Sequence, residues 1–418
     1  MNKLKKVPEL RFKEFSEEWE AKRYGDIYSF YTTNSFSRDN LNYENGSVRN
    51  IHYGDIHTKF STMFKAENEE VPFINEDINL KKIKDESYCK IGDLVIADAS
   101  EDYADVGKTI EIISLNNEKT LSGLHTFLAR PIKYDMALGY AGYLLQTWKV
   151  RWQVMREAQG TKVLGLSTKR LASVTLTIPS KQEQEKIASF LCTVDNSIKQ
   201  LTKKEKLLRE YKKGVMQKIF SQEIRFKDDE GSEFPEWIER KLGDFLIHKS
   251  IKNKEKKVNL VLSVSNKKGF ISQEEQFDGY EVASKDLSNY KIVDNGDYAY
   301  NPSRINVGSI ARLDNFEKGI VSPMYVVFSL NNLDSNFFNA LYNTHLFKHL
   351  IKIGCSGSVR DSLNFNDMAD FKIKMPILQE QTKIADFLSS VDTKIEQVNK
   401  QVNLTKEFKK ALLQKMFV

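Results

Sequence analysis

The sequence predicts an α+β chain in which two globular halves, each a twisted β-sheet with helices, are each followed by one long helix. Three observations favour this fold class: a stretch of sequence that returns 197 residues later, a heptad pattern in both copies, and short Val-, Ile-, Phe- and Tyr-rich runs ahead of each copy. They divide the chain into a first globular domain (1–180), a central helix (181–222), a second globular domain (223–375) and a C-terminal helix (376–418).

The repeat is the most specific of these signals. "PSKQEQEKIASFLCTVDNSI" begins at Pro179 and "PILQEQTKIADFLSSVDTKI" at Pro376, and 13 of 22 aligned residues are identical without a gap. The match continues into "REYKKGVMQKIF" and "KEFKKALLQKMF". Upstream, "LRFKEFSEEWEAKRYGDI" corresponds to "IRFKDDEGSEFPEWIERKLGDF", which pairs Trp19 with Trp237, and "DVGKTI" corresponds to "NVGSIA". The chain is therefore a tandem duplication.

The two globular halves show the same order of local patterns. The first contains strand-like runs such as "GDLVIADAS" and "KTIEIISL", then the helical pattern "MALGYAGYLLQTWKVRWQVMREA" and the short strand "SVTLTIP". The second contains "GDYAYNPS" and "GIVSPMYVVFSL", then "SNFFNALYNTHLFKHLIKI" and "DFKIKMP". This order predicts a sheet with one or two helices in each half.

Apolar residues at alternating four- and three-residue steps predict the long helices, because this spacing forms an a/d seam on one helix face. In the first copy they are Ile187, Leu191, Val194, Ile198, Leu201, Leu208, Val215 and Ile219, and in the second Ile384, Leu388, Val391, Ile395, Val398, Val402, Leu412 and Met416. Polar residues occupy a few seam positions (Glu205, Lys212, Thr405, Lys409), where they would set register. Pro179 and Pro376 stand where each helix starts.

Composition indicates an ordinary soluble chain with a modest net charge of +6. Residues 181–222 carry ten Lys and Arg against five Asp and Glu, so the excess charge is concentrated in the central helix. No apolar run is long enough for a membrane span, and no secretory signal follows the N-terminal basic residues. Three widely spaced cysteines predict neither a zinc site nor disulfides, so we expect a reduced cytoplasmic protein.

The motifs of an enzyme are missing. The sequence has no GxxxxGK[ST] loop, no GxGxxG turn and no HExxH helix. "NPSR" (301–304) is only superficially similar to the tetrad of amino-methyltransferases, since the second proline and the aromatic residue are lacking. His345 and His349 have metal-compatible spacing without an evident third ligand. We therefore predict a non-catalytic chain with no catalytic residue, no metal and no cofactor of its own.

Polar, aromatic and basic residues gather instead in the loops of both halves. Arg, Asn and Ser can hydrogen-bond base edges, and Lys can hold phosphates, so these loops predict DNA contacts. The candidates are Arg49, Asn50, His52, Tyr53, Lys59, Thr161, Lys162, Lys169 and Arg170 in the first half, and Lys267, Lys268, Asn301, Ser303, Arg304, Asn306, Arg312, Ser356, Ser358 and Arg360 in the second.

Two variable halves, each followed by a helix that opens P-x-x-Q-E-Q-x-K-I-A-x-F-L and closes in Gln-Lys-(Ile/Met)-Phe, resemble the specificity subunit of type I restriction–modification systems. The resemblance covers essentially the whole chain. It implies that each half is a target recognition domain that reads one half of a bipartite double-stranded DNA sequence. It also implies that the two helices pair as an antiparallel coiled coil and fix the gap between the half-sites.

The resemblance further implies two methylation subunits and additional restriction subunits as partners in a bacterial or archaeal cytoplasm. Those partners would use S-adenosylmethionine, ATP and Mg²⁺. The starts of the helices would then face the partners, or the DNA between the domains, through Gln182, Glu183 and Gln184 in the first copy and Gln379, Glu380 and Gln381 in the second.

Two other classes of function fit the sequence less well. A coiled-coil adaptor that binds protein would account for the heptads but not for two globular halves with matched scaffolds and divergent loops. A self-sufficient methyltransferase or nuclease would need cofactor motifs that the sequence lacks.

Overall fold

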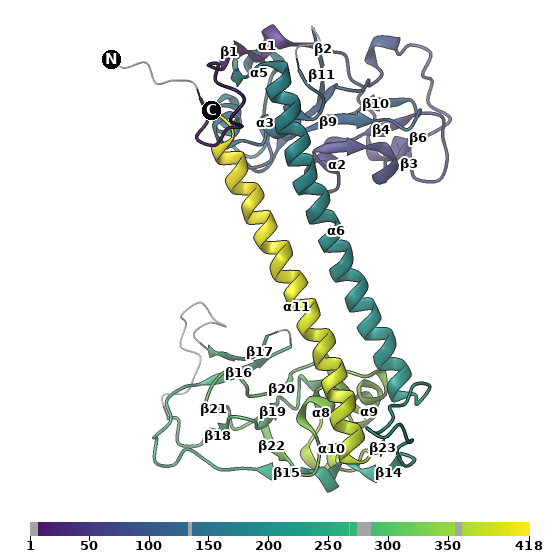
Figure 1. Ribbon diagram of the computed structural model, residues 1–418, viewed down its shortest axis with the longest axis vertical. Helices are drawn as coiled ribbons and strands as arrows, with labels where there is room; N and C mark the ends of the chain where they lie inside the picture. Colours follow the sequence, from purple (N-terminus) through teal and green to yellow (C-terminus); the bar gives the residue numbers. More distant parts are fainter. Residues whose placement is uncertain (1–6, 133–135, 267, 274–285, 356–361) are drawn as a thin grey trace. The chain divides into compact units, whose positions relative to one another are not determined.

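The computed structural model describes residues 7–132, 136–266, 268–273, 286–355 and 362–418 (Figure 1). These residues form two compact units. Unit 1 combines the chain up to Thr202 with Lys400–Val418, and unit 2 consists of Lys203–Asn399. Each unit therefore contains one globular half, the first part of the long helix that follows it, and the last part of the other long helix.

Unit 1 is built around a five-stranded sheet in the order β2-β11-β7-β9-β5, which is antiparallel except for the β5–β9 pair. A second, four-stranded sheet has the order β10-β4-β6-β3. The strands are β1 (Glu20–Arg23), β2 (Tyr28–Tyr31), β3 (Leu41–Asn42), β4 (Arg49–Ile51), β5 (Met63–Lys65), β6 (Phe73–Ile74), β7 (Leu94–Ala97), β8 (Ala99–Ser100), β9 (Thr109–Ser114), β10 (Thr120–Ser122), β11 (Thr126–Pro131), β12 (Leu164–Gly165) and β13 (Thr175–Ile178). The helices are α1 (Tyr24–Ile27), α2 (Tyr53–Thr58), α3 (Tyr140–Leu144), α4 (Trp148–Glu157) and α5 (Thr168–Ser173).

Unit 2 repeats the central part of this plan. Its four-stranded sheet has the order β15-β22-β19-β20. These four strands correspond, in that order, to β2, β11, β7 and β9 of unit 1. The strands are β14 (Ile238–Lys241), β15 (Leu246–Lys249), β16 (Leu262–Ser265), β17 (Gly269–Ser272), β18 (Lys291–Asp294), β19 (Tyr298–Tyr300), β20 (Ile310–Arg312), β21 (Lys318–Val321), β22 (Val326–Leu330) and β23 (Lys372–Met375). The helices are α8 (Ser335–Tyr342), α9 (His345–Cys355) and α10 (Phe365–Ala369).

In both units a short antiparallel strand pair precedes the long helix. β1 pairs with β13 in unit 1, and β14 pairs with β23 in unit 2. This pair joins the beginning of each globular half to the strand that leads into its long helix. The predicted α+β class and the duplication are confirmed by this shared topology.

The long helices are α6 (Lys181–Phe220) and α11 (Leu378–Lys415), close to the predicted limits. Their first seam residues belong to the core of their own globular half: Ile187 and Leu191 pack with the core of unit 1, and Ile384 and Leu388 with that of unit 2. In Figure 1 the start of α6 accordingly lies beside α3.

Within each unit the two helices pack side by side. In unit 2, Asn399 Nδ2 donates to Glu205 Oε1 at 3.1 Å, and Lys212 Nζ lies 2.6 Å from Asp392 Oδ1. Residue numbers rise along α6 from Glu205 to Lys212, whereas those of their partners on α11 fall from Asn399 to Asp392. The two helices therefore run antiparallel. Unit 1 contains the duplicate of one of these contacts, because Lys409 Nζ lies 2.7 Å from Asp195 Oδ1. Three polar seam residues thus pair across the helices, as register-setting positions do.

Buried hydrogen bonds fix the start of each long helix to its own unit. Glu183 accepts from Arg11 Nε at 2.8 Å and from Nη2 at 2.7 Å. Glu380 accepts from Arg225 Nη2 and from Trp237 Nε1, both at 3.0 Å. The glutamate of the Gln-Glu-Gln triplet therefore has the same structural role in both units.

The second glutamine of the triplet completes this anchor. Gln184 donates to the carbonyl oxygen of Pro179 and accepts from Ala137 N at 3.0 Å. Gln381 makes the same bonds in unit 2, to Pro376 and from Asp334 N. The closing phenylalanines of the repeat are also structural, since Phe417 packs edge-on against Trp19 and Phe220 against Trp237.

A carboxyl group, that of Glu111, is buried in the core of unit 1. Glu111 accepts from Gly139 N at 2.6 Å and from Gly142 N at 2.7 Å. Burial raises the pKa of Glu111 from 4.5 to about 7, although the two backbone donors act in the opposite direction. The proton is therefore held more tightly in the folded chain than in the unfolded one.

This raised pKa predicts how the stability of unit 1 depends on pH. The stabilisation by the bound proton is complete below pH 4.5 and is lost as the pH rises to about 7. The Glu111→Gln variant lacks this titrating group. Its free energy of unfolding, relative to that of the wild type, should therefore rise across that window by on the order of 3 kcal/mol and then stay constant. Urea unfolding at several pH values, followed by hydrogen exchange in unit 1, measures the difference. A difference that does not change with pH would contradict the assignment.

Candidate nucleic-acid interface

Three of the residues predicted to contact DNA in unit 1 instead form contacts with other residues of the same unit. Arg49 donates to both carboxylate oxygens of Glu118, and its guanidinium lies 4.2 Å from the centre of the Phe73 ring. Asn50 is fully buried and accepts from Asn34 Nδ2 at 2.7 Å. His52 is buried and caps α2 by accepting from Gly54 N. These three residues are therefore set aside as DNA contacts.

His52 is also held in its neutral form. Burial, and then the charge of Arg38, lower the pKa of His52 from 6.5 to about 4. The neutral ring can accept the hydrogen bond from Gly54, which an imidazolium could not do.

Tyr53 lies at the centre of a group of imidazole rings. Its ring centre is 4.7 Å from that of His52, 5.7 Å from that of His57 and 5.2 Å from that of His125. The sequence interpretation missed His125, which is exposed and has a positive φ of 54°. Left-handed backbone at a residue other than glycine is a signal of functional loops, but it cannot be read from sequence.

The remaining candidates of unit 1 are accessible. Lys59 contacts the hydroxyl of Tyr43 at 3.1 Å and Asp55 at 3.4 Å, and Arg170 lies 3.6 Å from Glu157. Thr161, Lys162 and Lys169 are exposed, and within the described part of the chain neither of these lysines forms an ion pair. Lys162 and Lys169 are therefore available to hold phosphates.

In unit 2 the most exposed candidates lie on one loop between β19 and β20. Asn301 shapes this loop, since its side chain accepts from Ser303 N at 3.1 Å and its backbone N donates to Ser309 O. Ser303, Arg304 and Asn306 are exposed on it, and Lys268 is exposed in the β16–β17 turn.

For one residue of unit 2 the predicted DNA contact is corrected, and four others lie outside the described residues. Arg312 is half-buried and donates to the exposed carboxylate of Asp314 and to the hydroxyl of Ser335, so it is set aside as a DNA contact. Lys267, Ser356, Ser358 and Arg360 lie outside the described residues.

Only the first residue of each Gln-Glu-Gln triplet is exposed. Gln182 and Gln379 are exposed, whereas Glu183, Gln184, Glu380 and Gln381 are buried and bonded within their own units. The four buried residues are therefore corrected from partner contacts to internal anchors. The seam residues Ile187, Leu191, Val194, Ile384, Leu388, Val391, Ile395 and Val398 are buried, and Ile198 and Leu201 are half-buried.

Two apolar pairs on the long helices were not singled out from the sequence. Leu207 and Tyr211 on α6 are 53% and 54% exposed, and Leu404 and Phe408 on α11 are 54% and 52% exposed. Each pair lies 197 residues from the other, with the same spacing of four residues. Large apolar side chains at such exposure are typical of a surface that another protein covers.

Among the residues that the structure describes, neither a metal site nor a membrane-spanning helix is found. The described residues contain no cluster of three His, Cys, Asp or Glu side chains that could hold a metal ion. Among the helices in these same ranges, none combines the length and apolar character that crossing a bilayer requires.

Comparisons with known proteins agree on one family. The family model described as type I restriction modification DNA specificity domain matches residues 16–209 and 235–406. The putative type I restriction enzyme MjaX specificity subunit of Methanocaldococcus jannaschii is 25% identical over 417 residues, which cover 96% of this chain and 93% of that protein.

Solved structures show the same fold. The S subunit of the type I restriction–modification system of M. genitalium superposes with a TM-score of 0.57 at 14% identity, covering 99% of both chains. A chain from a structure of the assembly and conformational transition of a type I R-M system superposes with a TM-score of 0.51 at 13% identity, covering 96% of this chain and 97% of that one.

Proposed function

The chain belongs to the family of type I restriction–modification specificity subunits, with two tandem recognition domains, and we propose that each unit reads one half of a bipartite DNA target. The observation that carries this proposal is the combination of a shared scaffold with different loops. The two units have the same sheet order and the same helix anchors. Their loops differ in length, shape and side chains, so they can read different bases with equivalent surfaces.

In unit 2 the reading residues are Arg304 and Asn306, supported by Lys268. Arginine binds guanine edges, and asparagine binds adenine edges, through two hydrogen bonds each. In unit 1, Lys162 and Lys169 bind the phosphate backbone of the DNA, and Tyr53 and His125 contact its bases. The modest net charge of +6 implies that partner subunits add further contacts.

Substitutions in one unit should change one half-site. Arg304→Ala is expected to relax the choice of base at one position of the unit 2 half-site, at a cost of about 1–3 kcal/mol of discrimination. The half-site read by unit 1 should stay unchanged. Selection from a random duplex library by the complex with its methylation subunit measures both. Lys162→Ala is the control, because loss of a phosphate contact weakens binding to all sequences.

This chain supplies recognition, and the chemistry comes from its partners. Methylation subunits contribute S-adenosylmethionine, and restriction subunits contribute ATP and Mg²⁺, in the cytoplasm of a bacterial or archaeal cell. The exposed pairs Leu207 with Tyr211, and Leu404 with Phe408, are the surfaces on which two copies of the same methylation subunit would dock.

The apolar pairs predict the stoichiometry of this complex. Leu207→Ser with Tyr211→Ser should remove one methylation subunit, because the lost burial costs about 3 kcal/mol, or roughly a hundredfold in affinity. Native mass spectrometry should then show one methylation subunit per chain instead of two. Lys206→Ser with Glu210→Ser is the matched control, since it changes an exposed ion pair of the same spacing. Retention of both subunits by the apolar variant would rule out this docking site.

A further inference from the structure

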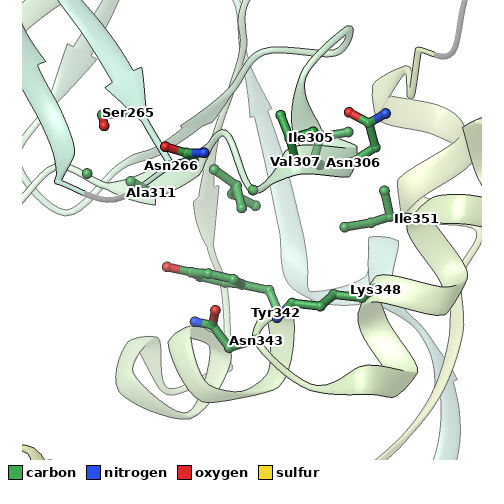
Figure 2. Close-up of a pocket in the computed structure, with 13 residues that line it drawn as sticks. Ser265, Asn266, Ile305, Asn306, Val307, Ala311, Tyr342, Asn343, Lys348 and Ile351 are labelled. Atoms are coloured by element: carbon green, nitrogen blue, oxygen red, sulfur yellow. The ribbon is translucent and has the colours of Figure 1, made fainter. Parts of the chain in front are cut away.

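Unit 2 contains a cavity of about 540 Å³ next to the loop that carries Asn306. This volume is within the range of sites that hold small organic ligands. Figure 2 shows Ile305 and Val307 on one side of the cavity and Tyr342, Asn343 and Lys348 on the other. Ser265 and Asn266, from the β16–β17 hairpin, lie at its flank.

The lining combines three kinds of group. Asn266, Asn306 and Asn343 supply amides, Lys348 supplies a positive charge, and Ile305 with its apolar neighbours supplies apolar surface. None of the described residues that line the cavity is acidic. The cavity therefore favours an anionic ligand that also has hydrogen-bonding edges and an apolar face.

The corresponding place in unit 1 is closed. Arg151 on α4 donates to the carbonyl oxygens of Ala104 at 3.0 Å and Val106 at 2.7 Å. Val106 is fully buried, and a Cβ at Gly107 would lie only 2.5 Å from Val154. The helix thus packs directly on the loop.

A comparison of equivalent residues in the two units explains why the cavity is open in unit 2. Lys348 is the counterpart of Arg151, 197 residues later, and Val307 is the counterpart of Val106. A lysine has no fork that could bind two carbonyl groups at once. Val307 is 60% exposed, and a Cβ at Gly308 would meet nothing closer than 3.7 Å. The cavity is therefore a difference between two copies of one scaffold.

We infer that this cavity binds one nucleotide. The amides match the donor and acceptor pattern of a base edge, the apolar wall and the Tyr342 ring suit the base face, and Lys348 suits the phosphate. The inference rests on the proposed function, which brings nucleotides to unit 2. The nucleotide comes either from solution or from the bound DNA, turned out of the duplex.

Two measurements on the full chain distinguish these sources. Equilibrium dialysis with labelled ATP and dAMP tests the nucleotide from solution. For the DNA source, 2-aminopurine is placed at each position of the unit 2 half-site, and its fluorescence is recorded in the complex with the methylation subunit. Saturable binding, or a fluorescence increase at one position, supports the inference when the cavity variants lose it, because the methylation subunit can also turn a base out of the duplex.

Variants assign either signal to the cavity. Lys348→Met and Asn266→Ala should each weaken nucleotide binding about tenfold, or abolish the fluorescence increase. Lys254→Met is the matched control, since it removes an exposed charge of unit 2 away from the cavity. Unchanged thermal unfolding shows that the variants are folded.

The inference is overturned if neither nucleotide binds and no position brightens, or if the signals persist in both cavity variants. Selection of a bipartite sequence by the same preparation separates this failure from failure of the proposed function. If the preparation selects a bipartite sequence but gives no cavity signal, the proposed function is supported and the nucleotide site is ruled out.

Discussion

Inserting one heptad into both long helices, after Thr202 in α6 and after Asn399 in α11, is expected to lengthen the gap between the half-sites by about three base pairs. Seven helical residues add about 10 Å, and base pairs are stacked about 3.4 Å apart. The insertion points are the limits of the two units, and they are equivalent in the duplication. The contact of Asp195 with Lys409 therefore stays within unit 1, and that of Lys212 with Asp392 within unit 2.

A heptad also keeps the seam on the same helix face, because it completes two turns of a coiled coil. Mapping methylated sites in cells that carry the variant measures the result. Both half-sites should be kept, and methylation at the original spacing should be lost.

Insertion into α6 alone is the matched control. It adds residues to one helix that have no counterpart in the other, so it should destabilise the chain instead of giving a new spacing. A double insertion that keeps the original gap, or that changes the half-sites, would show that the helices do not measure the DNA.

Glu380→Gln is expected to destabilise unit 2 by about 3 kcal/mol, because it leaves the Arg225 guanidinium without its buried anion. Glu380 is fully buried and binds both Arg225 and Trp237 Nε1. The hydrogen bond to Glu380 raises the pKa of Arg225. A guanidinium stays protonated in proteins even without a partner, so removing the anion leaves the positive charge uncompensated. Urea unfolding followed by hydrogen exchange in Lys203–Asn399 measures the loss in this unit.

Arg225 supplies its own control. Glu236 lies 3.0 Å from the same guanidinium, but its side chain is 88% exposed. Glu236→Gln should therefore cost less than about 1 kcal/mol. Equal effects of the two substitutions would mean that burial does not decide the strength of the anchor.

The helices could be predicted because their signal is periodic and local. Seam positions such as Leu191 and Leu388 follow one spacing, and a spacing that continues along a helix of 40 residues is typical of long paired helices. The sheet order could be predicted only as a class. Residues paired between β5 and β9, such as Met63 and Glu111, are far apart in the sequence, and no local pattern specifies that pairing.

The site was harder to predict, because the same residue types serve structure and recognition. Asn50 and Arg312 are polar residues of short strands, as a DNA contact could be, but their partners Asn34 and Ser335 are distant in sequence. Glu183 belongs to the most specific motif of the sequence, yet it binds Arg11 inside the unit. A repeated motif indicates a shared requirement, and here the requirement is to anchor the helix.

The most direct test of the account is selection from a random duplex library by the wild-type chain in complex with its methylation subunit. We expect one asymmetric consensus made of two short specified sequences separated by a gap of fixed length and no base preference. A single continuous consensus, or no sequence preference at all, would contradict the claim that the two units read separate half-sites.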